Sequence, residues 1–492
     1  MRIVGNNPQL SRQTQGTASG AITGGKPVIV NTDGTVTEIA GSATSVGTSV
    51  VFETGLTESL GMAATFDSNS NRIVIAYQDG GNSNYGTAIV GTIDSSDNSI
   101  SFGTAVVYHS ANSNYNTASF DSNSNKVVIA FTAPADGTGK SYVGTVDPSD
   151  NSISFGSAVN FQAGARASHV SSAFDSNSNK VAIFYEDNGN NNYGTGIVGT
   201  VSGTSISYGS EAVFESAQVS AISATFDSSN NKVVIAYRDH GNSNYGTAVI
   251  GTISSTSISF GTPVVFESAI TTGCSATFDN NSNKVFIAYD DHGATTQNAI
   301  IGTVSGTSIS FGTAVAYETG VSTGNLLATG FDSSTNKVVV GYGDAGDSNK
   351  GKISVGSISG TSVSFETPVE YDSGSTAPGY CEIPFDSNTN RLLLPYKDGN
   401  TDPAQAGAAV VIQTSATNLT TSENFIGFAQ DTVATGQPVT INTKGAIDEN
   451  QSSLTPAQQY FVQTDGTLGT SADDPSVVAG TAVTATKLIV KG

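Results

Sequence analysis

The chain has 492 residues, with 41 acidic and 19 basic side chains and a formal net charge of −22 at pH 7. Such a surface repels phosphate backbones, so we expect no nucleic-acid partner. The sequence has no apolar run of the roughly 18–20 residues that cross a bilayer, so we expect no membrane insertion.

The N-terminal stretch MRIVGNNPQLSRQTQG has no apolar h-region, so we expect synthesis in the cytoplasm without a Sec signal peptide. Residues 1–44 and 414–492 resemble each other. GGKPVIVNTDGTVT at 24–37 parallels TGQPVTINTKGAID at 435–448, and VQTDGTLGT repeats the same hairpin signal. We expect both chain ends to build one small β module, with a flexible linker at 414–424.

Between these ends, one phrase occurs seven times at intervals of 52 to 54 residues. Its Phe-Asp steps begin at Phe66, Phe120, Phe174, Phe226, Phe278, Phe331 and Phe385. A period near 50 residues indicates a solenoid or a propeller. In residues 222–270, ISATFD, KVVIAYRD, TAVIGTIS and a segment after STSISF are four strands separated by turn residues. Four antiparallel strands per unit predict an all-β, seven-bladed propeller over residues 45–413.

The segment KVVIAY is apolar at consecutive positions, which indicates a strand covered on both faces, as between neighbouring blades. We expect the repeat Phe to be the main core side chain of its blade. Cys274 and Cys381 lie four residues before this Phe, where other repeats have Met62, Val170, Ile222 and Leu327, apart from one Asn. Both cysteines are therefore predicted to be small buried hydrophobes rather than part of a disulfide framework.

The last repeat has no fourth strand of its own. The segment SVGTSVVFETG at 45–55 matches the fourth-strand pattern SFGTPVVFESA, although no first three strands precede it. We expect residues 45–54 to complete the last blade and so close the ring, which removes two open sheet edges.

No catalytic or phosphate-binding motif is present, and the sequence predicts a protein that is not an enzyme. His240 and His292 share one loop position, which favours a surface role. The six arginines of the chain are scattered, so the arginine cluster of a sialidase-type propeller is not expected.

An acidic residue ends the second strand in six repeats. The candidate binding residues on these loops are Asp79, Tyr85, Asp187, Tyr193, Asp239, His240, Tyr245, Asp291, His292, Asp344 and Asp398. Oxygen-rich loops of this kind suit Ca²⁺, and Asn with Tyr suits a sugar. The alternative is a turn in which Asp caps local backbone amides.

A second acidic position follows the aromatic residue of the fourth strand. It holds Glu53, Glu215, Glu267, Glu318 and Asp372. Both acidic positions fall on one face of a propeller, the loop-rich face, whereas the opposite face has only short turns. Chain direction predicts that residues 1–44 and 414–492 leave from the short-turn face, so the acidic face points away from the module.

The opening residues and the ending GTAVTATKLIVKG resemble structural proteins of marine tailed phages, and the FDSNSNKVVIAYRDHGNSNYGTAVIGT repeat resembles blades of such virion proteins. The resemblance implies a fibre, head-decoration or tail-associated protein on the virion surface. It implies that the terminal module contacts other virion proteins and that the propeller meets a host glycan or protein. A carbohydrate-binding lectin is the alternative, and a polysaccharide hydrolase is a third.

Overall fold

A computed structural model describes residues 12–31, 33–39, 43–55, 57–319, 327–374, 377–378, 382–399, 405–415, 424–463, 466–472 and 476–491. Two compact units form, one from Thr44–Thr414 and the other from Met1–Ala43 with Ser415–Gly492. No helix among the described residues is long and apolar enough to cross a membrane. The predicted all-β propeller with antiparallel sheets is confirmed for the larger unit. An antiparallel pairing of first with second strand and of second with third strand recurs at each repeat Phe.

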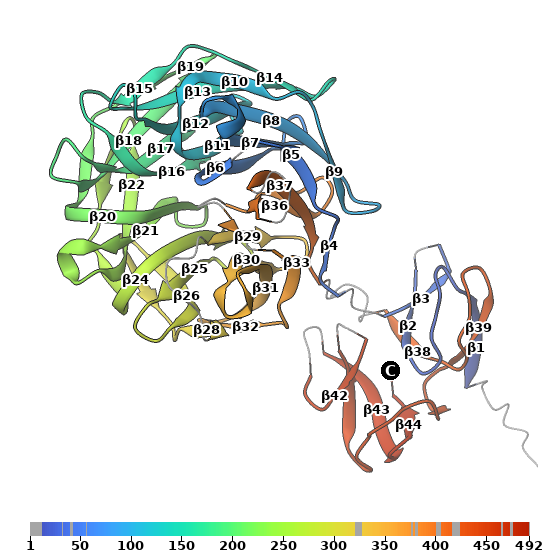
Figure 1. Ribbon diagram of the computed structural model, residues 1–492. Coiled ribbons are helices and arrows are strands. Elements are labelled where there is room, and N and C mark those ends of the chain that lie inside the picture. Colours follow the sequence, from blue (N-terminus) through green and yellow to red (C-terminus); the bar gives the residue numbers. More distant parts are fainter. Residues whose placement is uncertain are drawn as a thin grey trace, which may run out of the picture. The chain divides into compact units, whose positions relative to one another are not determined.

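We number the blades 1 to 7 by their repeat Phe, from Phe66 to Phe385. The first strands, toward the middle of the ring in Figure 1, are β6 (Thr57–Asp67), β11 (Asn114–Asp121), β16 (Ala167–Asp175), the later parts of β20 (Ala212–Asp227) and β24 (Val264–Asp279), β29 (Ala328–Asp332), and β34 (Ala377–Pro378) with β35 (Phe385–Asp386). The second strands are β7 (Arg72–Asp79), β12 (Lys126–Ala133), β17 (Lys180–Asp187), β21 (Lys232–Asp239), β25 (Lys284–Asp291), β30 (Lys337–Asp344) and β36 (Arg391–Asp398).

The third strands are β8 (Tyr85–Asp94), β13 (Thr138–Asp147), β18 (Tyr193–Ser202), β22 (Tyr245–Ser254), β26 (Thr296–Ser305), β31 (Lys350–Ser359) and β37 (Ala406–Gln413). Each fourth strand has two pieces. In blades 1 to 6 these are β9 (Ser99–Phe102) and β10 (Val106–Asn112), β14 (Ser152–Phe155) and β15 (Val159–Gln162), β19 (Ser205–Tyr208) and early β20, β23 (Ser257–Phe260) and early β24, β27 (Ser308–Phe311) and β28 (Val315–Thr319), and β32 (Ser362–Phe365) and β33 (Val369–Asp372). Three short 3-10 helices follow second strands: η1 (Gly80–Asn82), η2 (His240–Asn242) and η3 (Ala345–Asp347).

The N-terminal segment closes the ring as predicted. The pieces β4 (Ser45–Val46) and β5 (Val50–Glu53) both pair antiparallel with β37 of blade 7. Phe52 of this segment packs edge-on against Tyr77 of blade 1, with ring centroids 5.2 Å apart. The Arg391 guanidinium of blade 7 also donates to the Ser95 carbonyl of blade 1, at 3.0 Å. Blades 7 and 1 are therefore joined by packing and hydrogen bonds.

A glycine in the fourth strand sets the fit between neighbouring blades. A Cβ added at Gly47, Gly103, Gly156, Gly209, Gly261 or Gly312 would lie 1.8–2.2 Å from a backbone carbonyl oxygen in the next blade's turn between its third and fourth strands. The first of these contacts, Gly47 with Asn98, is the one at the closing junction. Blade 6 has Glu366 at this position, because its neighbour has no such turn: the chain enters blade 7 at Thr44, whose hydroxyl donates to Glu366 at 2.9 Å.

We expect Gly261→Ala to destabilise the ring by about 1–3 kcal/mol, because the new methyl group overlaps the Thr307 carbonyl and both backbones must move. Chemical denaturation of the full chain measures the change. Glu366→Ala tests the same position where no turn faces it, and we expect a smaller effect there. Equal losses in the two variants would show that the close contact is not the cause.

The cores lie between blades. In one of them, Ala182, Phe184 and Phe214 of blade 3 pack with Val233, Ile235 and Tyr237 of blade 4. The tyrosines that end the KVVIAY segments are fully buried: Tyr77, Tyr185, Tyr237, Tyr289, Tyr342 and Tyr396. Cys274 is also buried, as predicted, and its thiol donates to the Ala221 carbonyl. Cys381 lies outside the described residues.

The prediction for the repeat Phe is wrong in most blades. Only Phe331 is buried, at 9% exposure, whereas the other six repeat Phe side chains are half-buried. Five of these six, Phe66, Phe120, Phe174, Phe226 and Phe278, border the central channel, because the first strand lies at the inner edge of its blade and has no further strand beyond it. The fully buried aromatic side chain is instead the second-strand Tyr, or Phe131 in blade 2.

The smaller unit has two five-stranded sheets. One has the order β1 (Gln13–Thr17), β39 (Pro438–Asn442), β38 (Phe425–Ala429), β2 (Pro27–Val30) and β3 (Val36–Glu38). The other has the order β40 (Ile447–Asp448), β44 (Lys487–Val490), β43 (Val477–Thr484), β41 (Gln459–Val462) and β42 (Leu468–Gly469). One hydrophobic core joins them, and it includes Ile29, Phe428 and Leu488. The predicted module from both chain ends is thus confirmed.

Two of the three predicted hairpins of this unit are present, β2 with β3 and β41 with β42. The third is wrong, because β39 pairs with β1 and β38 while β40 pairs with β44 of the other sheet. The predicted linker at 414–424 lies mostly outside the described residues.

Candidate functional site: the loop-rich face

The second-strand Asp residues bind the backbone of their own loops. The Asp239 carboxylate accepts from the backbone N–H groups of Gly241 (2.9 Å) and Asn242 (3.1 Å). Asp79 and Asp187 each accept one such N–H, at 2.9 Å, and Asp291 and Asp344 each accept two. Asp79, Asp187, Asp239, Asp344 and Asp398 are at most 8% exposed. This is the amide-capping geometry of the turn alternative.

The acids of the fourth strand bind tyrosines of the next blade. The Tyr hydroxyl donates to the Glu carboxylate in the pairs Tyr77–Glu53 (3.3 Å), Tyr237–Glu215 (3.0 Å), Tyr289–Glu267 (2.9 Å) and Tyr342–Glu318 (3.2 Å). Because the first of these crosses the closing junction, the bond also helps to fasten the ring. Burial, followed by the charge of Glu53, raises the pKa of Asp79. Burial and the charge of Asp239 likewise raise the pKa of Glu215.

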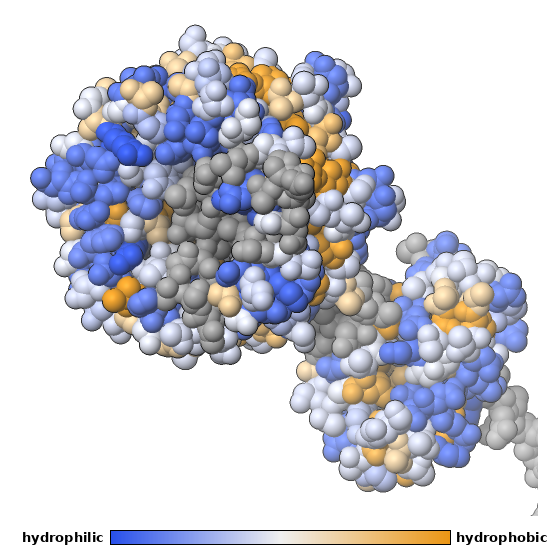
Figure 2. Space-filling model, in the orientation of Figure 1, coloured by the Kyte–Doolittle hydropathy of each residue, from blue (hydrophilic) through white to orange (hydrophobic). Residues whose placement is uncertain are grey.

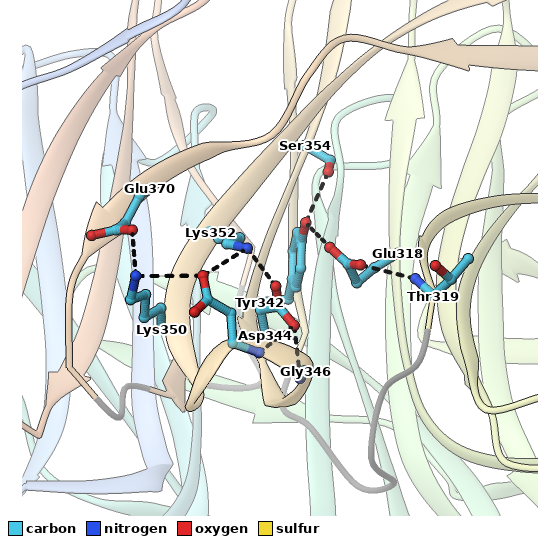
Figure 3. Close-up of polar contacts among 10 residues, drawn as sticks. Glu318, Thr319, Tyr342, Asp344, Gly346, Lys350, Lys352, Ser354 and Glu370 are labelled. Carbon is cyan, nitrogen blue, oxygen red and sulfur yellow. Dashed lines mark hydrogen bonds and ion pairs between the residues drawn. The ribbon is translucent and has the colours of Figure 1, made fainter.

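Blade 6 neutralises its acids with lysines (Figure 3). Lys352 pairs with Asp344 at 2.5 Å and with Asp347 at 3.3 Å. Lys350 pairs with Glu370 at 3.3 Å. Blades 1, 3 and 4 have Thr87, Thr195 and Thr247 at the position of Lys352. In the view of Figure 2 the ring is largely hydrophilic, with hydrophobic colour near β5, where Val51 is 40% exposed.

The other predicted binding residues are spread over several blades. Tyr85, Tyr193 and Tyr245 begin the third strands of blades 1, 3 and 4 and are half-buried. His240 lies 2.8 Å from the Ser220 hydroxyl, whereas His292 is exposed. No group of three or more His, Cys, Asp and Glu side chains in the described ranges is arranged to hold a metal ion. Calcium and sugar binding at these loops stay predictions.

A polar cluster that was not predicted joins blades 2 and 3, beside the connection from blade 3 to blade 4. The rings of Tyr115 and His169 lie 4.8 Å apart, His169 Nε2 is 3.9 Å from a Glu186 carboxylate oxygen, and Gln218 donates to Glu186 at 3.1 Å. Tyr115 and His169 have positive φ angles, both +51°, at bulges in the first strands. Ala221, at the equivalent position of blade 4, has a φ of +49°, so the left-handed backbone belongs to the repeated bulge and only the side chains at this position differ.

The protonation states of this cluster follow from its burial. Glu186 is 5% exposed, and burial raises its pKa. Burial also lowers the pKa of His169 to about 4, so this imidazole is neutral at pH 7. The cluster therefore presents two rings, a carboxyl group and an amide, which is a set that binds polar ligands with flat faces.

Two variable positions in the repeat give the sequence signal for this cluster. The residue before the second-strand Asp is the first, and it is Gln78, Thr132, Glu186, Arg238, Asp290, Gly343 or Lys397. The second lies five residues before the repeat Phe, where Tyr115 and His169 replace Gly61, Ala221 and Gly273. Variation among otherwise repeating blades marks positions that the scaffold does not fix.

No family model matches the chain, and no curated protein matches it. Among the solved structures to which the chain is similar, three have TM-scores below 0.5. A mutant of AofleA from Arthrobotrys oligospora has 10% identity and a TM-score of 0.42, over 69% of this chain and 94% of that one. Sqt1 from Saccharomyces cerevisiae has 12% identity and a TM-score of 0.43, over 73% of this chain and 84% of that one. The NanB sialidase from Streptococcus pneumoniae has 10% identity and a TM-score of 0.43, over 74% of this chain and 70% of that one.

Proposed function

We propose that the protein is a non-enzymatic structural component of a phage particle, in which the propeller displays its loop-rich face for attachment to a host surface. The observation that supports this most is the use of the repeated acids. Asp239 caps backbone amides and Glu215 accepts a tyrosine hydroxyl, so these carboxylates maintain loops and blade junctions. A hydrolase instead needs two carboxyl groups that face one substrate.

The small β module is the proposed attachment to other virion proteins. Both connections to it leave blade 7 at its short-turn end, where Gln413 pairs with Ser45. Thr414 there donates to Asp332, in the short turn of blade 6, at 2.6 Å. Because the two connections leave opposite to the loop-rich face, attachment through the module is compatible with an accessible loop-rich face.

The test is the protein composition of purified virions. We expect the chain to be present at a fixed ratio to the major capsid protein, and its copy number to separate a capsid decoration from a tail fibre. A chain found only in the lysate supernatant, and not in washed particles, would contradict the proposal and favour a free lectin.

The cluster of Tyr115, His169, Glu186 and Gln218 favours a glycan as the host ligand, because sugars bind through aromatic faces together with carboxylate and amide groups. We expect Tyr115→Ala and Glu186→Gln each to weaken binding of the full chain to host-surface polysaccharide at least tenfold, which is about 1.4 kcal/mol. Surface plasmon resonance on immobilised polysaccharide measures this. Ser68→Ala, an exposed change in the short turn of blade 1, is the control. Unchanged binding in both cluster variants would exclude this cluster as the glycan site.

A further inference from the structure

The central channel of the propeller has one carboxylate in a ring of small side chains. The position three residues before the repeat Phe lines the channel in six blades, and holds Ala63, Thr117, Ser171, Ser223, Ser275 and Glu382. The remaining blade has Ala328 there. Because six blades have Ala, Ser or Thr at this position, the fold requires only a small side chain there. The fold therefore does not explain why blade 7 has a glutamate, Glu382.

Glu382 borders both parts of the channel, a narrow part with room for about one water molecule and a wide mouth of about 380 Å³ at the short-turn face. Its carboxylate has no hydrogen-bond or ion-pair partner in the part of the chain that the structure describes. The other described residues that line both parts are Phe, Val, Ile, Leu, Ala, Ser, Thr and Asn, with the thiol of Cys274. Burial raises the pKa of that thiol, which keeps it neutral.

The wide mouth is aromatic. Phe66, Phe120, Phe174, Phe226 and Phe278 border it, and hydroxyl groups such as those of Thr225 and Thr277 lie between them. These rings are half-buried, so each packs partly on a blade core and partly faces the cavity. Phenyl faces attract organic cations, and the attraction is strongest where water is partly excluded.

We propose that this mouth binds a small organic ammonium ion, whose charge pairs with Glu382 and whose methyl or methylene groups pack on the phenyl rings. The volume exceeds that of a tetramethylammonium ion, and the hydroxyl groups are available to a polar substituent of the ligand. This site lies at the opposite face from the Tyr115 cluster and goes beyond the proposed function.

The pH dependence of binding follows from the surroundings of Glu382. Glu382 is exposed to the solvent of the channel, but the surrounding channel wall still desolvates its carboxylate and raises its pKa to about 7; no other charged side chain contributes. The cation binds the ionised carboxylate, so affinity is full above pH 8. It falls about tenfold for each pH unit below 7, where the carboxyl group holds a proton.

The test is calorimetric titration of the full chain with tetramethylammonium chloride at pH 8, against sodium and potassium chloride at equal ionic strength. We expect saturable binding of tetramethylammonium with one site per chain. We expect Glu382→Gln, which keeps the side-chain shape, to weaken binding at least tenfold and to abolish the loss of affinity between pH 8 and pH 5. Phe226→Leu, which keeps an apolar group without the ring, should weaken binding several-fold.

Glu370→Gln is the matched control, because it removes one carboxylate from the outer strand of blade 6. Its binding should equal that of the unaltered chain. An unchanged affinity in Glu382→Gln, or no saturable heat at all, would overturn the proposal. Equal affinity for potassium would also overturn it, because the site would then be a simple counter-ion site. Melting curves of each variant establish that it is folded.

Discussion

Removing residues 1–55 should cost the ring on the order of 5 kcal/mol, as the sum of two or three lost side-chain burials. Val46 packs on the core between blades 6 and 7, and Val50 and Phe52 pack on the core between blades 7 and 1. The deletion also removes the partners of β37 and leaves an open sheet edge, which promotes aggregation. Thermal unfolding with light scattering measures both effects.

The matched control removes only residues 1–43. This shorter deletion takes the same strands β1, β2 and β3 from the small unit but keeps β4 and β5. We expect the melting transition of the propeller to stay where it is in the full chain. If the longer deletion also gave a monomer with an unchanged transition, the N-terminal segment would not be what holds the ring closed.

The ring and its closure could be predicted from the sequence because they depend on repetition. Seven repeats at intervals of 52 to 54 residues define the blades, and the unmatched fourth strand at 45–54 has only one vacant place, beside β37. Residues 435–448 show the limit of local patterns. Their sequence matches a hairpin, but the strands on either side of the turn have stronger partners in two different sheets.

The invariant Phe was misassigned for a related reason. Repetition shows that a residue matters to every blade, but it does not show whether the side chain lies between blades or beside the axis. The second strand is apolar at every position from Val233 to Tyr237, so Tyr237 had to be buried whichever way it faced. Phe226 lies at the inner edge, where one side has no neighbouring strand.

The candidate site was harder to predict than the fold. Asp79 and its equivalents were predicted as binding residues because they recur in the repeat. Recurrence favours a role in the scaffold, however, and these carboxylates cap the backbone amides of their own loops. The Tyr115, His169 and Glu186 cluster comes from positions that differ between blades. Tyr115 and His169 also have a left-handed backbone at a bulge, and this conformation could not be predicted from the identity of their side chains.

Tyr237→Ala should therefore cost more than Phe226→Ala, in reverse of what the sequence suggests. Tyr237 is fully buried between blades 3 and 4, and its ring lies 5.2 Å from that of Phe214. Truncation leaves a cavity and removes a donor from Glu215, so we expect a loss of about 3–5 kcal/mol. Phe226 is half-buried at the channel mouth. We expect its truncation to cost about 1–2 kcal/mol, since folding buries only part of the surface of its side chain.

Tyr237→Phe separates the two contributions. It keeps the ring and removes the hydroxyl that donates to Glu215, so we expect a loss of about 1 kcal/mol, the usual net value of one hydrogen bond. Urea denaturation of the three variants at pH 7 gives the free energies, provided that the transitions keep the same slope. Because repeat arrays need not unfold as one unit, hydrogen exchange in blades 3 and 4 should accompany the measurement. If Phe226→Ala proved as costly as Tyr237→Ala, the repeat Phe would be a core residue after all, and the aromatic mouth of the channel would be misassigned with it.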